Sequence, residues 1–71
     1  ENVRGIRTSD GWVFNWSDTG VHELYDLNSD PGEIRNLAVE SSSRDRMRKL
    51  ADKIRMWQQR TDDDLVLPDI G

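Results

Sequence analysis

The stretch Trp12-Val13-Phe14-Asn15-Trp16 decides the fold of this chain. Successive side chains of a β-strand point to opposite faces of the sheet, so the three aromatic side chains share one face and Val13 and Asn15 share the other. Aromatic side chains bury much apolar area, and their face is expected to lie in the core. Residues 12–16 are therefore predicted to form a strand with one buried face.

Turn-forming sequences flank this strand on both sides. Residues 9–11 read Ser-Asp-Gly and residues 17–20 read Ser-Asp-Thr-Gly, and glycine adopts the positive φ that tight turns require. Residues 2–8 and residues 21–27 have the apolar and β-branched content of two further strands. The simplest assembly of the three segments is an antiparallel meander over about residues 2–27.

The sequence after the sheet predicts one long helix. A turn with a Pro-Gly pair is expected at residues 28–33, followed by one short helical turn at residues 34–39. From about residue 42 to residue 60, apolar side chains recur at spacings of three and four, as on an amphipathic helix; they are Met47, Leu50, Ala51, Ile54 and Trp57. This stripe is expected to cover one face of the sheet, and residues 61–71 are predicted to be an irregular tail.

The whole chain, residues 1–71, is thus predicted to be a single α+β domain. It consists of a small antiparallel sheet of about three strands and one long C-terminal amphipathic helix packed across it. Hydrophobic residues make up only 34% of the 71 residues, so the core is expected to be thin. The sequence has no cysteine, which excludes disulfides, thiol nucleophiles and thiolate metal ligands. It also has no apolar run of the length of a membrane span, and no membrane partner is expected.

Charge is unevenly distributed along the chain. The net charge is −4, yet residues 44–60 contain seven basic and two acidic residues, so this segment carries +5 and the rest carries −9. A basic helix attracts sulfated glycans or nucleic acid, but the acidic remainder opposes such binding. The ordinary solvated face of an amphipathic helix accounts for these residues better, and no nucleic-acid partner is expected.

A longer motif lies between the sheet and the helix. Residues 23–33 read Glu-Leu-Tyr-Asp-Leu-Asn-Ser-Asp-Pro-Gly-Glu, and residues 36–38 read Asn-Leu-Ala. This stretch resembles the ELYDL-x-x-DPGE-x-x-NLA signature found near the end of many sulfatases, the arylsulfatase-like hydrolases of sulfuric esters. With flanking agreement, the resemblance covers roughly residues 2–65. The strand at residues 12–16 departs from it, because the family pattern there reads like R-Y-K-Y-I.

The resemblance implies a noncatalytic C-terminal domain of a sulfatase. In that family a small sheet with a long helix across it is attached to a large α/β domain, so the partner is the catalytic domain of the same parent chain. The strand with Tyr25 and the helix ending at Trp57 are then expected to pack together as one scaffold. The family's sheet often has one more strand before Arg7-Thr8, which implies an exposed sheet edge here.

The chemistry of a sulfatase is expected to reside in the parent and not in this segment. The family uses calcium and a formylglycine nucleophile made from a C/S-x-P-x-R motif. Ser29, Asp30 and Pro31 imitate the start of that motif, but Glu33 stands where arginine is required. No catalytic residue, cofactor or metal site is therefore expected in this chain, and the chain alone is not expected to be an enzyme.

Two further sets of side chains carry alternative interpretations. Trp12, Trp16 and His22 are candidates for contact with a sugar or aryl group at the border of the parent's substrate cleft, whereas the aromatic stripe is also needed for the core and His22 suits an ordinary sheet position. Asp26, Asn28 and Asp30 imitate the opening of a calcium loop. Hydrogen bonds to their own turn backbone explain the second set better.

Two other functions stay open at this point. One is an autonomous binding or interaction module that uses the basic helix or the exposed sheet edge. The other is self-association of the isolated chain through apolar surface that the catalytic domain would otherwise cover.

Overall fold

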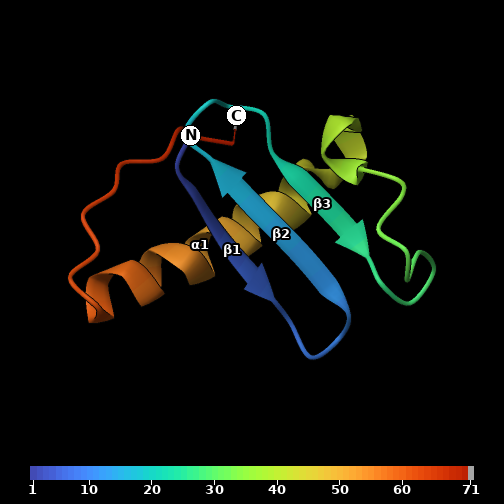
Figure 1. Ribbon diagram of the computed structural model, residues 1–71, viewed down its shortest axis with the longest axis horizontal. Coiled ribbons are helices and arrows are strands. Elements are labelled where there is room, and N and C mark those ends of the chain that lie inside the picture. Colours follow the sequence, from blue (N-terminus) through green and yellow to red (C-terminus); the bar gives the residue numbers. More distant parts are fainter. Residues whose placement is uncertain (71) are drawn as a thin grey trace.

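The structure is a computed structural model that describes residues 1–70. Along the chain it contains β1 (Val3–Arg7), β2 (Trp12–Ser17), β3 (Glu23–Asp26), the short 3-10 helices η1 (Leu37–Val39) and η2 (Ser41–Ser43), and α1 (Arg44–Arg60). The strands form one antiparallel sheet in the order β1-β2-β3, and α1 crosses one face of it diagonally, from behind β3 to beyond β1 (Figure 1). The predicted α+β class and the meander are confirmed.

The strand register assigns each side chain to a face of the sheet. Phe14 pairs with Ile6 on one side and Leu24 on the other, and Phe14 and Leu24 belong to the core beneath α1. One position earlier on β2, Val13 pairs with Arg7 and Tyr25, which places this row on the face that α1 does not cover. The sheet therefore has one face packed on the helix and one uncovered face.

The core joins the sheet, the helix and the tail. Its largest fully buried side chains are Trp16, Phe14 and Leu24, and the helix adds Met47, Leu50, Ala51 and Ile54. Burial of one such side chain is worth roughly 1.5–3 kcal/mol, so a few large residues compensate for a low hydrophobic content. The expected burial of the aromatic face of β2 is confirmed for Phe14 and Trp16.

The predicted helix stripe is wrong at its last member. Trp57 is 51% exposed, and Gln58 occupies the next buried position at 8% exposed. Gln58 follows Ile54 by four residues and so stays on the covered side of α1. Its amide donates to Asp63 Oδ2 at 3.3 Å and to the Leu65 carbonyl at 3.0 Å, which satisfies the polar group inside the fold.

The expected packing of Tyr25 and Trp57 into one scaffold is also wrong in detail. Tyr25 lies in the Val13 row on the uncovered face, whereas Trp57 lines a groove on the α1 side with Ile6. The strand and the helix meet through Leu24, which belongs to the same core cluster as the helix residues.

The tail is irregular from Thr61 to Ile70, as predicted, but it is packed and not free. Leu67 is 8% exposed and joins the core, and Trp16 Nε1 donates to the Pro68 carbonyl at 2.8 Å. Gly71, the last residue of the predicted tail, lies outside the described residues. Within residues 1–70 there is no helix with both the length and the apolar character needed to cross a bilayer.

Candidate functional site

The residues of the sulfatase-like signature form a compact corner between β3 and η1. The first turn of this signature corner, residues 23–38, begins at Asp26, whose carbonyl accepts from the backbone N–H groups of Ser29 at 3.3 Å and Asp30 at 2.8 Å. Asp26 Oδ1 accepts from the Asn28 N–H at 3.1 Å. Asp26 thus closes the first turn with both its backbone and its side chain.

Asp30 holds the second half of the signature corner. Its Oδ1 accepts from the Ile34 N–H at 3.1 Å and its Oδ2 from the Arg35 N–H at 2.8 Å, while its carbonyl accepts from the Glu33 N–H at 3.0 Å. The turn also requires a φ of +53° at Glu33. The prediction that Asp26 and Asp30 bond to turn backbone is confirmed. No group of three metal-ligating side chains comes together among residues 1–70.

Asn36 closes the outer edge of β3 with its side-chain amide. Its Oδ1 accepts from the Leu24 N–H at 3.0 Å, and its Nδ2 donates to the His22 carbonyl at 3.1 Å. The same Oδ1 accepts from the Ala38 N–H at 3.0 Å and so caps η1. The amide takes the place of a neighbouring strand, a role that sequence analysis did not assign, although the signature marks the position.

Asn28 ties the signature corner to the turn between β1 and β2. Its Nδ2 donates to the Asp10 carbonyl at 2.9 Å, and the Leu27 N–H donates to the Gly11 carbonyl at 2.8 Å. Gly11 has a φ of +95°, and a Cβ there would lie 2.8 Å from Asn28 Nδ2. Glycine is required here by both the backbone and the close approach of the amide.

The three candidates for a substrate cleft are placed differently from one another. Trp16 is 1% exposed and is held by Pro68, so the core interpretation of this residue is confirmed. Trp12 is half-buried, with the guanidinium carbon of Arg46 4.5 Å from its ring centroid.

His22 is half-buried near the opposite end of the sheet from Trp12. Its Nδ1 accepts from the Ser17 N–H at 3.2 Å, and burial lowers the pKa of the imidazole below its ordinary value. Trp12 pairs with Asp26 at the end of β3, whereas His22 lies just before β3. His22 is thus about four residues from Asp26, or roughly 13 Å along the strand direction. The structure does not bring these candidates together into one site.

An ion pair joins the first strand to the tail. Arg4 Nε lies 2.6 Å from Asp63 Oδ2 and Arg4 Nη2 lies 3.1 Å from Asp63 Oδ1, a bidentate arrangement. The Arg4 hydrogen bond is the largest cause that lowers the pKa of Asp63 to about 2, and hydrogen bonds from the Leu65 N–H and Gln58 add to it. The run of three aspartates in the sequence gave no sign of which one would be paired.

The uncovered face of the sheet carries a small polar network. Asn15 Nδ2 donates to Glu23 Oε1 at 3.2 Å, and the Tyr25 hydroxyl donates to Glu23 Oε2 at 3.0 Å. The bond to Glu23 raises the pKa of Tyr25, and burial adds to the rise. Beside this network Val13 is only 8% exposed, so the face combines one buried apolar side chain with satisfied polar groups.

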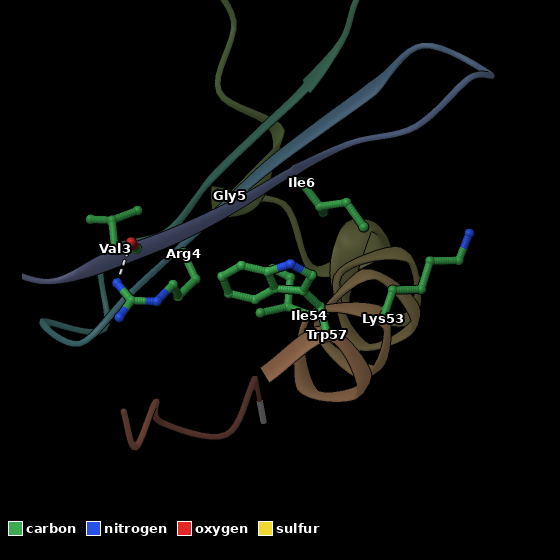
Figure 2. Close-up of a pocket in the computed structure, with 7 residues that line it drawn as sticks. All are labelled: Val3, Arg4, Gly5, Ile6, Lys53, Ile54 and Trp57. Carbon is green, nitrogen blue, oxygen red and sulfur yellow. Dashed lines mark hydrogen bonds between the residues drawn. The ribbon is translucent and has the colours of Figure 1, made fainter. Parts of the chain in front are cut away.

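A groove lies between β1 and the last turns of α1 (Figure 2). Its lining residues are Val3, Arg4, Gly5, Ile6, Lys53, Ile54 and Trp57. Its volume of about 240 Å³ is below the roughly 300–1,000 Å³ of small-molecule pockets.

Comparisons of the chain with protein-family models, with curated proteins and with solved structures found no match.

Proposed function

We propose that this chain is a noncatalytic structural domain of a sulfatase, a hydrolase of sulfuric esters, and that it buttresses the catalytic domain of the same parent chain. The proposal rests on one observation: polar side chains of the signature bond to backbone groups nearby. Asp26, Asp30 and Asn36 each bond to backbone groups of the signature corner. Polar side chains that bond to the backbone of their own turn stabilise that turn, which is the role expected of a scaffold.

The support comes from the signature corner and not from packing between Tyr25 and Trp57, which lie on opposite sides of the sheet. The residues of this chain also do not fit the formylglycine and calcium chemistry of the family. Both carboxylate oxygens of Asp30 accept turn N–H groups, and Glu33 replaces the arginine that the nucleophile motif needs. Nucleophile and metal would therefore belong to the parent's other domain.

The uncovered face of the sheet is the surface that fits a neighbouring domain. Val13 and Tyr25 lie at one end of it in the row with Arg7, and the exposed side chains of Val3 and Val21 lie at the opposite end. Domain interfaces of this type mix apolar and polar contacts. Of the residues considered for the border of a substrate cleft, Trp12 and His22 keep some exposed surface, whereas Trp16 has almost none.

Two measurements test this function. The coding sequence upstream of Glu1 is expected to encode a C/S-x-P-x-R motif several hundred residues earlier, and an unrelated upstream sequence would contradict the proposal. The purified chain is expected to show no turnover of an aryl sulfate, with or without added calcium. Turnover that co-purifies with the folded chain would overturn the noncatalytic assignment.

A polyanion-binding module is the second candidate, and the contacts of the basic helix speak against it. Arg48 pairs with Asp45, Arg55 pairs with both Asp52 and Asp69, and Arg46 lies over Trp12. Because these arginines already contact carboxylates or an aromatic ring within the domain, they attract a polyanion less strongly. The chain is expected to pass through a heparin column at physiological salt, and retention that falls steeply with salt would favour the module.

A further inference from the structure

The last backbone N–H of β2 on the β3 side has a side-chain partner. The pairing of β2 with β3 ends at Asn15 opposite Glu23, because β3 begins at Glu23. In an antiparallel ladder, alternate residues of β2 point toward β3, so the Ser17 N–H lies one step beyond this last pair. His22 Nδ1 accepts this N–H at 3.2 Å. The imidazole thus takes the place that a carbonyl of β3 would have in a longer ladder.

The turn at residues 17–22 is held by two hydroxyl groups. The Thr19 N–H donates to Ser17 Oγ at 3.1 Å, and the Val21 N–H donates to Thr19 Oγ1 at 3.2 Å. Ser17 is only 2% exposed, so its N–H has little access to water while the turn is closed. The hydrogen bond from Ser17 to the His22 ring is therefore needed for a closed turn.

His22 also joins this turn to the signature corner. Its carbonyl accepts from Asn36 Nδ2 at 3.1 Å, and Asn36 Oδ1 accepts from the Leu24 N–H at 3.0 Å. The imidazole packs against Phe14 of the core, with 6.1 Å between the two ring centroids. One residue therefore links the end of β2, the start of β3 and the signature corner.

Only one protonation state of the imidazole allows the hydrogen bond from Ser17. A backbone N–H needs an acceptor, so Nδ1 is unprotonated and the neutral ring carries its proton on Nε2. A second proton would bind to Nδ1 and would turn this acceptor into a donor that faces the Ser17 N–H. Burial beside Phe14 also disfavours the charged ring and lowers the pKa of His22 below its ordinary value of 6.5. Protonation is thus incompatible with the closed turn.

No carboxylate among residues 1–70 bonds to this ring. Asp18 in the turn accepts from Asn2, and Glu23 accepts from side chains on the opposite, uncovered face. Glu1 borders a hollow on that same uncovered face. Charged groups on β1, the signature corner, α1 and the tail pair with one another, namely Arg4 with Asp63, Arg35 with Glu40, and Arg55 with Asp52 and Asp69. A proton on the His22 ring is therefore bound more tightly once the turn has opened.

We propose that His22 is a pH-sensitive switch in the fold, and that protonation of its imidazole opens the turn at residues 17–22 and releases Asn36 from the His22 carbonyl. At neutral pH the unprotonated Nδ1 holds the Ser17 N–H and the turn is closed. In mildly acidic solution the charged ring leaves the Ser17 N–H, and Asn36 loses one of its backbone partners. This inference goes beyond the structural role proposed above and does not depend on the identity of the parent protein.

The test is hydrogen exchange of the ¹⁵N-labelled chain between pH 7.5 and pH 5. Each rate is converted to a protection factor, which removes the intrinsic effect of pH on exchange. The open turn binds a proton with the ordinary pKa of histidine and the closed turn with a lower one, so opening becomes more favourable as the pH falls through 6.5. Protection of the Ser17 amide is expected to fall about threefold or more over this range, together with that of the Asn36 side-chain amide.

Dilute urea distinguishes opening of the turn from unfolding of the whole chain. A local opening exposes little surface, so urea is expected to leave the protection of Ser17 unchanged. The amide of Ile54, inside α1 and the core, is expected to lose protection steadily as urea is added. Equal sensitivity of the two amides would assign the pH effect to global unfolding and would contradict a local switch.

Substitutions of His22 separate protonation from loss of the acceptor. His22→Asn places an amide oxygen, which does not titrate, where Nδ1 accepts, so protection of Ser17 is expected to be independent of pH. His22→Phe keeps a ring against Phe14 but has no acceptor, and Ser17 is expected to be weakly protected at every pH. Asp18→Asn removes the carboxylate of the turn instead, and the pH dependence of Ser17 is expected to remain.

The ring of the native chain gives a measurement that needs no variant. Its ¹⁵N chemical shifts are expected to show an unprotonated Nδ1 at pH 7.5 and a titration midpoint below pH 6.5. A proton on Nδ1 at pH 7.5 would overturn the proposal. So would protection of Ser17 that is constant between pH 7.5 and pH 5, or a pH dependence that persists in His22→Asn.

Discussion

At the scale of single residues, the side chain of Asn36 holds three backbone groups of the fold. One amide satisfies the Leu24 N–H, the His22 carbonyl and the Ala38 N–H, all in partly buried positions. Asn36→Ala is expected to lower the free energy of unfolding by about 1–3 kcal/mol, because these backbone groups lose their partner away from bulk water. Urea denaturation followed by circular dichroism measures the change.

Two companion variants sharpen the Asn36 test. Asn36→Asp keeps the acceptor for Leu24 and Ala38 but sets a carboxylate oxygen against the His22 carbonyl, so it is expected to destabilise the chain as well. Gln59→Ala removes an exposed amide from α1 and is expected to change stability by less than about 0.5 kcal/mol. Equal effects of Asn36→Ala and Gln59→Ala would show that the edge closure contributes nothing.

Asp63 gives the domain a pH dependence with a defined sign. Its pKa is lowered to about 2 in the folded chain by the Arg4 hydrogen bond, against an ordinary value near 3.8. The carboxylate therefore stabilises the fold fully above pH values of about 4, and this contribution is lost as the pH falls toward about 2. The stability difference between the native chain and Asp63→Asn is expected to be largest at pH 5 and to shrink at pH 2. A difference that stays constant between these two pH values would contradict the assignment.

At the scale of elements, regular structure was predictable and the packing of irregular structure was not. The alternation in residues 12–16 and the spacing from Met47 to Ile54 each repeat a local geometry, so both elements follow from the sequence. Gln58, and not Trp57, is buried, because Asp63 and the Leu65 carbonyl satisfy its amide. A local hydrophobic pattern does not predict such hydrogen-bond partners. The same limit applies to the site, because Asn36 accepts from the N–H of Leu24 in β3, twelve residues earlier in the sequence.

Neighbouring residues of the tail differ strongly in burial. Leu67 is 8% exposed in the core cluster, whereas its neighbour Val66 is 85% exposed. Leu67→Ala is expected to destabilise the domain by about 2–4 kcal/mol, and Val66→Ala by no more than about 0.5 kcal/mol. Thermal unfolding of the two variants measures the contrast. Similar melting temperatures would show that the tail is not part of the folded core.

At the scale of the whole molecule, the fold is closed by contacts between its two ends. Arg4 of β1 pairs with Asp63, and Trp16 of β2 donates to the Pro68 carbonyl, so the tail is tied to the sheet at two points. The core beneath these ties is shared by the sheet, α1 and the tail. A small domain with one shared core is expected to unfold in a single cooperative step, because no part keeps a core of its own when another part is lost.

This cooperativity is measurable with probes at different places. Far-UV circular dichroism reports mainly on α1, and the Gly5 amide signal reports on β1. Their denaturation midpoints are expected to coincide, and the Arg4→Gln variant is expected to shift both together, since the ion pair lies between the first strand and the tail. A β1 that is lost at lower denaturant than α1 would contradict the single cooperative step, because the first strand would then unfold independently of the shared core.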